Sequence, residues 1–467
     1  MNPTLQQDLN EIKIILEKVK QQGIDFLDSI DTIATSNENR ITPDRNLNDT
    51  GLGSLSALEE FNERLAPLMV SQTGPRYWGF VTGGATPASI VGDWLATIYD
   101  QNTQATNAQG GVSALIEIET INLLLQLLNL PKNYLGGFVT GATMSNFTCL
   151  AVARQWFGSQ LGKDFAKNGI SEPIHVLSAT PHSSSVKCLA MLGMGSQNFT
   201  KIKTIEGNRE AIDITDLEKN IESLNGKPFI LISSAGTVNT ADFDDFNAIT
   251  KLRNKYNFWW HIDAAFGGFA ACSPKHNHLV NGWENADSIT VDCHKWLNVP
   301  YESAFYLVKE EYKNLQIESF QNSNAPYLGN PLDNFNYLNF LPENSRRLKA
   351  LPVWFSLLAY GKQGYQDIIE NSVAMALQLD AFISENENFE LLAPTRLNNV
   401  CFTLAGDHNQ EKVNLFLTHL NEKGKVFMTP TVYENKKGIR ASFVNWRTNE
   451  NDIQIVMNEM KESLLSI

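Results

Sequence analysis

The sequence is poor in cysteine, carries fewer basic than acidic residues and contains no long apolar run. Its five cysteines form no C-x-x-C pair, which argues against a disulfide framework or a zinc site and favours reduced thiols. With 37 Lys and Arg against 51 Asp and Glu, the net charge of −14 disfavours nucleic acid and anionic membranes as partners. The most apolar stretch, 258–272, is too short to span a bilayer, and the N-terminus lacks the basic and apolar regions of a signal peptide. We therefore expect a cytoplasmic protein without a metal.

Length and periodicity indicate an α/β protein built from more than one packed unit. A chain of 467 residues exceeds what one hydrophobic core usually serves. Apolar residues at helical spacing over 4–31 predict an amphipathic helix within an N-terminal segment, 1–75. In a large domain, 76–350, strand-length apolar runs alternate with helical stretches, which predicts a mainly parallel sheet with helices on both faces. Strands are expected at 137–140, 175–177, 229–233, 259–262, 288–291 and 303–308.

The last part of the chain, 351–467, has a different pattern. A smaller α+β domain is expected there, because helical and strand-like stretches follow one another without the regular alternation of the large domain. Its predicted elements are a helix over 354–379, a strand over 399–404, a helix over 411–423 and a strand over 439–445. The linkers between these units are too short to suggest independent domains.

The strongest local signal for chemistry is the segment Asp-Cys-His-Lys-Trp at 292–296, which follows an apolar strand. It places Lys295 at the end of that strand, beside His294 and a tryptophan. Lysine forms imines with carbonyl compounds when part of its amine is uncharged, as in a partly buried site. The competing interpretation is an ordinary surface lysine. Lys295 is therefore a candidate imine-forming residue.

Three other segments supply groups that a cofactor bound to a lysine would need. Asp263 ends a strand before small residues, so its carboxylate could pair with a pyridinium nitrogen. The glycine-rich turn at 136–146 opens a helix whose N–H groups, with the Thr143 hydroxyl, could bind phosphate. His182 also opens a helix, and its imidazole could stack on a flat ring or move protons. Ligands of such sheets bind beyond the carboxyl ends of the strands, which favours one shared site.

Each of these segments also has a simpler interpretation. Asp263 could only cap a turn, and His182 could be a bystander in a serine-rich helix cap. The glycine-rich turn could bind a nucleotide, although it matches neither G-x-G-x-x-G nor the P-loop pattern. The coexistence of all three motifs with Lys295 is what favours a cofactor site.

The motifs occur together in the order and spacing of a known family. Glycine-rich turn, histidine, Gly236-Thr237, Asp263-Ala264-Ala265 and His294-Lys295 resemble the group II pyridoxal-phosphate-dependent decarboxylases, which include aromatic-L-amino-acid, glutamate and histidine decarboxylases. The resemblance extends from about residue 75 to the C-terminus. It implies the aspartate aminotransferase-like fold (fold type I) and a seven-stranded-type sheet. It also implies pyridoxal 5'-phosphate (PLP), an L-amino-acid substrate and a homodimer with active sites at the interface, on which the N-terminal segment packs.

The resemblance further implies roles for individual residues. Lys295 would form the Schiff base, Asp263 would partner the pyridine nitrogen, and His182 would stack on the ring and take part in catalysis. The remaining cofactor-binding positions would be Ala142, Thr143, Thr237, Ala265 and His294. No metal is implied.

In related decarboxylases, a tyrosine of a mobile loop protonates the intermediate after carbon dioxide has left. Counting back without a gap from Arg346-Arg347 places Tyr337 at that position, within a polar stretch, 322–345, that would form the lid. Aldehyde synthases of this family have phenylalanine there, so Tyr337 favours amine formation. The competing interpretation is an ordinary surface aromatic residue.

The substrate stays open, with a slight preference for an aromatic amino acid. Trp78 and Phe80 supply aromatic rings near the expected site, and Arg440 resembles the arginine that meets the substrate carboxylate in glutamate decarboxylases. The segment Gln-Ala-Thr-Asn at 104–107 stands where aromatic-amino-acid decarboxylases have large apolar side chains, which indicates a smaller or more polar pocket. Arg76 adds a cation to the aromatic residues of 76–80, so an acidic substrate also stays open. Transamination, aldehyde synthesis, carbon-carbon cleavage and a non-catalytic binding role also stay open, because one fold can host many functions.

Overall fold

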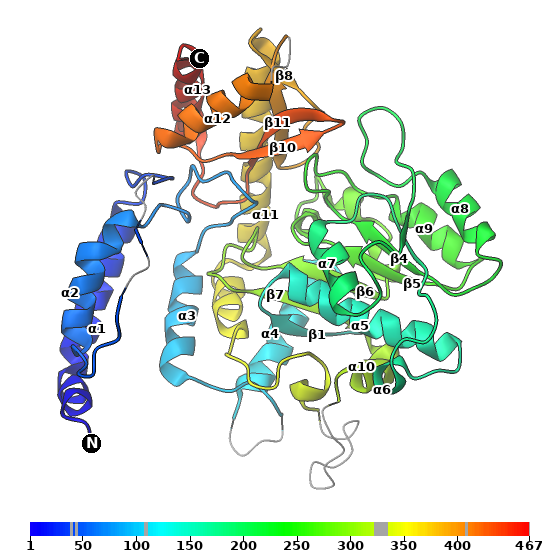
Figure 1. Cartoon of the computed structure of the whole chain (residues 1–467), viewed down its shortest axis with the longest axis horizontal. Coiled ribbons are helices and arrows are strands. Elements are labelled where there is room, and N and C mark those ends of the chain that lie inside the picture. The colour runs from blue at the N-terminus through cyan, green and yellow to red at the C-terminus, as the bar shows by residue number, and fades with distance from the viewer. Residues whose placement is uncertain (38–40, 43–44, 107–110, 322–334, 407–409, 467) are drawn as a thin grey trace.

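The structure is a computed structural model that describes all residues except 38–40, 43–44, 107–110, 322–334, 407–409 and 467. Two helices, α1 (Pro3–Asp28) and α2 (Ser54–Arg64), lie side by side at one edge of the molecule (Figure 1). The predicted N-terminal helix over 4–31 agrees with α1. The short η1 (Ala66–Leu68) follows them before the chain enters the body of the protein.

The body is built on a seven-stranded sheet in the order β1-β7-β6-β5-β4-β2-β3. Strand β7 is antiparallel to both of its neighbours, and the other pairs are parallel, so the predicted mainly parallel sheet is confirmed. The strands are β1 (Tyr134–Val139), β2 (Val176–Ser178), β3 (Phe199–Lys201), β4 (Ile230–Ser234), β5 (Trp259–Asp263), β6 (Ser288–Asp292) and β7 (Ala304–Lys309).

Helices cover both faces of this sheet. Helix α5 packs on the strands of one face, and α7 and α10 pack on α5. Side chains of α4, α8, α9 and the long α11 belong to the core of the other face. The helices of the large domain are α3 (Pro87–Tyr99), α4 (Ser113–Leu127), α5 (Ala142–Gln160), α6 (Phe165–Asn168), α7 (Ser183–Met191), α8 (Ile214–Ser223), α9 (Phe246–Arg253) and α10 (Lys313–Phe320).

The C-terminal part forms a second, antiparallel sheet of four strands in the order β10-β11-β9-β8. It lies beside α12 and α13 and next to the far end of α11, whose two halves meet at a non-helical Gly361 (Figure 1). The elements are α11 (Ala350–Glu385), β8 (Phe389–Leu391), β9 (Asn399–Leu404), α12 (Gln410–Glu422), β10 (Thr429–Tyr433), β11 (Lys436–Ser442) and α13 (Glu450–Leu464).

Two features of this layout differ from the sequence prediction. The pattern missed β3, β8 and β10. Strands β3 and β8 have only three residues, and β10 mixes buried with exposed residues, so none shows a long apolar run. The second concerns Trp78, which lies within the stretch predicted as the large domain but packs with C-terminal residues, beside Phe443. The boundary at 350/351 stays a prediction, since α11 begins there and packs on both parts.

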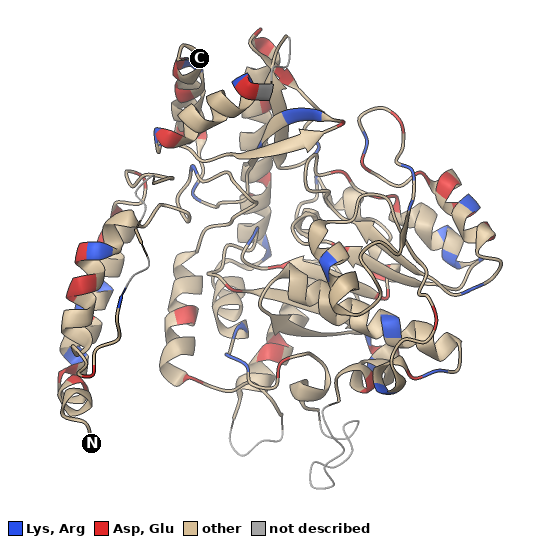
Figure 2. Cartoon of the chain, in the orientation of Figure 1, with Lys and Arg blue, Asp and Glu red and all other residues tan. Residues whose placement is uncertain are grey.

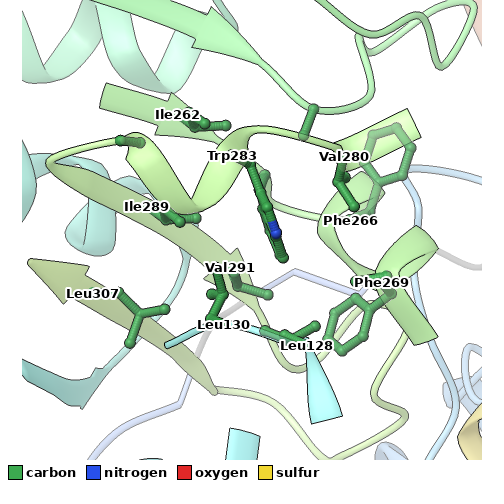
Figure 3. Packing of buried hydrophobic residues seen from close by; sticks show 14 of the residues in the cluster. Leu128, Leu130, Ile262, Phe266, Phe269, Val280, Trp283, Ile289, Val291 and Leu307 are labelled. Carbon is green, nitrogen blue, oxygen red and sulfur yellow. The ribbon is translucent and has the colours of Figure 1, made fainter. Parts of the chain in front are cut away.

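Alternation along the buried central strands separates polar from apolar side chains. In β5, Trp260 and Ile262 point into the core shown in Figure 3, where Ile262 lies near Ile289 of β6. His261 and Asp263 therefore point to the opposite face, toward α5, because successive side chains of a strand alternate. The same alternation in β6 turns Ser288, Thr290 and Asp292 toward α5. The sheet thus presents a polar row to one helix.

Charged residues are spread over the molecule. Figure 2 shows acidic and basic residues interspersed along the chain, with neither sign confined to one segment, against the net charge of −14. Within the described residues, no helix combines the length and apolar character needed to cross a bilayer.

A buried ion pair fixes the edge of the sheet next to α4. Glu117 of α4 accepts a hydrogen bond from the Phe138 N–H of β1 (2.8 Å) and pairs with Arg346, and neither side chain is exposed beyond a few per cent. Arg346 in turn donates to the carbonyls of Phe138 (2.8 Å) and Thr103 (3.3 Å). The pair therefore ties α4, β1 and the segment before α11 together.

Removing one partner of this pair leaves a buried charge without compensation. We expect Glu117→Ala to lower the free energy of unfolding by about 3 kcal/mol. Asn122→Ala, on an exposed position of the same helix, serves as the control and is expected to change it by less than about 0.5 kcal/mol. Denaturant unfolding measures both, and equal effects would contradict the importance of the pair.

Candidate active site

The candidate site lies at the carboxyl ends of β4, β5 and β6. Asp263 is the last residue of β5, and Lys295 follows three residues after the end of β6. Because β5 and β6 are parallel and adjacent, both groups reach the same edge of the sheet. A pocket opens there, and seven of the predicted site residues line it: Phe80, His182, Thr237, Asp263, Ala265, Lys295 and Arg440.

Lys295 is held by the turn that carries it. Its Nζ lies 3.3 Å from Asp292 Oδ2 and 6.0 Å from the centre of the Phe266 ring. Burial tends to raise the pKa of Asp292, but Lys295 and His294 outweigh it, so the pKa is lowered and the carboxylate stays charged. The backbone of Gly83 passes so close that a Cβ there would lie 1.8 Å from the Lys295 carbonyl oxygen, which only glycine permits.

Asp263 is surrounded by donors on the side away from the pocket. Its Oδ2 accepts hydrogen bonds from Asn146 Nδ2 (3.0 Å) and Ser185 Oγ (3.3 Å), and its Oδ1 accepts one from the Ala265 N–H (3.2 Å). A buried carboxylate is costly unless such partners are present. The side chain is therefore fixed in orientation with one edge in the pocket.

His182 caps the N-terminus of α7. Its Nδ1 accepts a hydrogen bond from the Ser184 N–H (3.2 Å) and lies 2.7 Å from Ser184 Oγ. Burial lowers the pKa of the imidazole, although Asp263 acts in the opposite direction, so the neutral ring is favoured. The predicted position of His182 beside Asp263 and Lys295 is found in the structure.

Thr237 stands on a loop after β4 that Gly236 makes possible. Gly236 has a φ of +91°, which side-chain-bearing residues rarely adopt. The loop is held by Glu210, whose Oε2 accepts hydrogen bonds from the hydroxyls of Thr237 and Thr240. Thr237 therefore reaches the pocket from a fixed loop.

The predicted phosphate-binding residues, Ala142 and Thr143, are the first residues of α5. No side chain among the described residues caps this helix, so its first N–H groups are available to an anion. A Cβ on Gly141 would lie 3.4 Å from the His294 ring, which puts the helix start beside the Lys295 turn. His294 itself stacks on Tyr301, with ring centres 4.2 Å apart, and its Nε2 lies 3.2 Å from Asp292 Oδ1.

Phe80 and Val81 line the pocket and have an unusual backbone conformation. Both have a φ near +60°, at 57° and 58°, and such a conformation costs on the order of 1 kcal/mol or more for residues other than glycine. Strain of this kind is concentrated at functional sites. Phe80 is 61% exposed, and this exposed aromatic ring at the pocket agrees with its predicted place near a substrate.

Five predicted site residues are not among those that line the pocket: Ala142, Thr143 and His294, which lie at the start of α5 and on the Lys295 turn, and Trp78 and Tyr337, which are buried elsewhere. Trp78 is 1% exposed, and its indole N–H donates to the Pro75 carbonyl within the small-domain core. Tyr337 is fully buried behind β1, where its hydroxyl donates to the Gly136 carbonyl (3.3 Å) and its ring lies under Arg346. Tyr337 thus packs in the core of its own subunit in this structure, and its role as the proton donor stays a prediction.

Part of the predicted lid falls outside the described residues, namely 322–334, and so does Asn107 of the segment 104–107. The described remainder of the lid, 335–345, packs on the large domain through Phe335, Tyr337 and Leu341.

Sequence reasoning missed several residues that hold the site. Asp292 is part of the lysine motif, but the motif predicts no role for it, and no motif singles out Asn146 or Ser184. A signal exists for Asn146, because it follows Ala142 by one helical turn and therefore lies on the same face of α5. Asp292 ends its strand as Asp263 does, which is the same pattern one strand away.

The order of the sheet and the convergence of a lysine, a carboxylate and an imidazole at its carboxyl edge define a PLP enzyme of fold type I. Residues 38–405 match the pyridoxal-dependent decarboxylase conserved domain. The chain belongs to this family of pyridoxal-dependent decarboxylases. It is accordingly a carboxy-lyase that uses PLP to decarboxylate an amino acid, as predicted from the sequence.

Individual relatives agree with this assignment. The chain is 30% identical over 397 residues to an aromatic-L-amino-acid decarboxylase from Bacillus atrophaeus, which covers 83% of this chain and 80% of that protein. It is 25% identical over 413 residues to a phenylacetaldehyde synthase from Petunia hybrida, covering 82% and 79%. The crystal structure of Catharanthus roseus tryptophan decarboxylase in complex with L-tryptophan has the same fold, with a TM-score of 0.85, 22% identity and coverage of 98% and 99%.

The residues present fit PLP on structural grounds. Asp263 offers an anion inside the pocket, Lys295 offers a primary amine, and the uncapped start of α5 offers free N–H groups for a phosphate. These three groups lie on adjacent elements along one edge of the sheet. No further group has to be assumed to account for the binding of the cofactor.

The buried position of Tyr337 leads to a test of its role. We expect Tyr337→Phe to lower the free energy of unfolding by about 1 kcal/mol, because the hydrogen bond to Gly136 is lost, and to leave the ratio of amine to aldehyde products unchanged. Unfolding and product analysis measure the two effects. A switch from amine to aldehyde in this variant would support Tyr337 as the proton donor.

Proposed function

We propose that this enzyme decarboxylates an aromatic L-amino acid to the corresponding amine, and that Lys295, Asp263 and His182 are the residues that hold and use the cofactor. The convergence of these three side chains in one pocket carries the proposal. The exposed Phe80 ring at the pocket and the aromatic-amino-acid decarboxylase among the relatives support an aromatic substrate.

In this proposal, Lys295 attaches the cofactor through its amine, and the start of α5, with Ala142 and Thr143, binds the phosphate. Asp263 keeps the ring nitrogen protonated, while His182 stacks on the ring. When bound, PLP supplies the electron sink for the pair released as the bond between Cα and the carboxylate breaks.

The other residues of the pocket orient the reacting groups. Ala265 would pack beneath the cofactor ring, and Thr237 would contact the cofactor from its fixed loop. Arg440 is nine-tenths buried, donates one hydrogen bond to the Val238 carbonyl (2.8 Å), and has an Nε without a hydrogen-bond partner among the described residues. It is the group proposed to meet the substrate carboxylate. Asp292, whose Oδ2 lies 3.3 Å from Lys295 Nζ, holds this amine in position.

An acidic substrate is the second candidate, and Arg440 is the observation that favours it. A buried cation at the pocket could bind a side-chain carboxylate as well as the α-carboxylate. Aldehyde formation must also be distinguished from amine formation. Tyr337 does not line the pocket, so its presence does not favour the amine, and a phenylacetaldehyde synthase is among the relatives.

An amino-acid panel tests the function directly. We expect carbon dioxide and a primary amine from aromatic amino acids, and loss of this activity in Lys295→Ala because the cofactor loses its attachment point. Lys251→Ala, on the exposed end of α9, is the matched control and should keep the activity. Release of carbon dioxide only from acidic substrates would favour the second candidate, and a keto acid would exclude decarboxylation by this site.

We further propose that the enzyme is a homodimer whose N-terminal segment packs on the partner. None of the 26 residues of α1 is buried, and Leu5, Leu9, Ile12, Leu16 and Val19 are exposed along it. Val91, Trp94 and Ile98 of α3 are exposed as well. Long amphipathic helices depend on the burial of their apolar face for stability, and a second copy of the chain would provide it.

The dimer proposal has a direct test. Leu9→Glu with Leu16→Glu should weaken self-association at least about tenfold, because charges are placed on the apolar face of α1. Gln6→Glu, which adds one charge at an exposed polar position of the same helix, is the control. Sedimentation at several concentrations measures the effect, and a monomeric unsubstituted protein would rule the dimer out.

The unpaired thiols support a cytoplasmic location, which we also propose. All five cysteines are free in the structure, and four of them are buried. Reduced thiols are the usual state in a cytosolic protein.

A further inference from the structure

A line of hydrogen bonds runs behind Asp263 into the protein. Trp259 Nε1 lies 3.0 Å from Ser288 Oγ, and this oxygen lies 2.9 Å from His261 Nδ1. His261 Nε2 lies 2.8 Å from Asn146 Oδ1, and Asn146 Nδ2 lies 3.0 Å from Asp263 Oδ2. All five side chains are buried and lie on the polar row between the sheet and α5.

The groups at the two ends of this line determine which atom donates and which accepts in each of its hydrogen bonds. An indole N–H can only donate, and a carboxylate oxygen can only accept. Asn146 must therefore present its Nδ2 to Asp263 and its Oδ1 to His261, since the flipped amide would place two oxygens against each other. His261 then carries its proton on Nε2 and accepts the Ser288 hydroxyl at Nδ1. Burial lowers the pKa of His261 to about 4, despite the nearby Asp263, so the ring is neutral at neutral pH.

A second branch leaves Asn146 toward His182. The Asn146 amide has two hydrogens, and Ser184 Oγ lies 3.3 Å from Nδ2. Because Ser184 Oγ accepts there, its own hydrogen is free for His182 Nδ1, 2.7 Å away. The Ser184 N–H also donates to Nδ1. The neutral His182 ring therefore carries its proton on Nε2.

We propose that Asn146 is a positioning residue whose buried amide orients the Asp263 carboxylate and, through Ser184, the His182 ring, with His261 fixing the direction of that amide. The inference rests on the roles proposed above for Asp263 and His182. Asn146 is not among the residues that line the pocket, so it acts through those two groups. The result is one carboxylate and one Nε2–H imidazole presented in fixed orientations to the cofactor.

A merely structural role for Asn146 makes a different prediction. If the network served only to satisfy buried polar atoms, its loss would lower stability and change nothing at the cofactor. The cofactor's visible absorbance and its affinity are therefore the informative readouts. The orientation of the ring protons is a third, and it does not depend on activity.

The first experiment compares Asn146→Leu with Ser145→Ala. Ser145 is the neighbouring buried residue of α5, and its hydroxyl donates to the Phe305 carbonyl (2.9 Å), away from Asp263. We expect Asn146→Leu to change the absorbance spectrum of the holoenzyme and to weaken cofactor binding about tenfold or more, the effect of losing a hydrogen bond to a charged group. Ser145→Ala should lower stability alone. Unchanged absorbance and affinity in Asn146→Leu would overturn the proposal.

A second pair of variants tests the direction set by His261. His261→Gln keeps an N–H donor for Asn146 Oδ1, whereas His261→Leu removes it. The glutamine variant is expected to retain the spectrum and affinity of the unsubstituted enzyme, and the leucine variant to resemble Asn146→Leu. Equal behaviour of the two would contradict the assigned direction. This pair of variants also tests the proposal if Asn146→Leu does not fold.

Nitrogen-15 NMR of histidine-labelled holoenzyme tests the protonation states without substitution at Asn146. We expect Nε2–H tautomers for both His182 and His261 at neutral pH, with His261→Gln identifying one signal. An Nδ1–H tautomer at either ring would refute the inference. Because this measurement needs no substrate, correct tautomers in a protein that releases no carbon dioxide would instead count against the proposed function alone.

Discussion

Asp263 has to keep a carboxylate inside the protein, and much of the surrounding structure follows from this constraint. The side chain ends a strand that is buried along its whole length, so water does not supply the hydrogen bonds it needs. The donors come instead from two helix starts, Asn146 of α5 and Ser185 of α7, and from the backbone of Ala265. The two helices that frame the cofactor site are thus also the ones that satisfy its central charge.

The sequence predicts those parts of the site that stand next to regular secondary-structure elements. Lys295, Asp263 and His182 follow or precede regular elements at fixed distances, so the rule that ligands bind beyond strand ends brings them together correctly. The central strands are predictable because they are long apolar runs. By contrast, β3 has no buried residue and pairs with β2 on the far side of α7, and β10 mixes buried with exposed residues although it pairs with the next strand, β11.

Trp78 and Tyr337, which do not line the pocket, show a further limit of prediction from the sequence. Both are aromatic residues in segments without regular periodicity, and an aromatic ring serves equally well in a core and in a pocket. The packing partner decides whether such a ring lies in a core or in a pocket. Trp78 packs against Phe443 of the small domain, and the Tyr337 ring contacts Arg346 of the buried ion pair. Neither contact follows from the spacing of the motifs, so spacing alone could not reveal it.

Other contacts between distant parts of the chain join the small sheet to the pocket. The Val238 carbonyl accepts hydrogen bonds from Arg440 of β11 and from Asn399 of β9 (3.0 Å). Val238 belongs to the loop that carries Thr237, which Glu210 holds from the large domain. A shift of the small sheet would therefore have to break these bonds or move the loop with it. Arg440 is consequently fixed relative to the loop that carries Thr237, and the packing of the two sheets sets where its side chain enters the pocket.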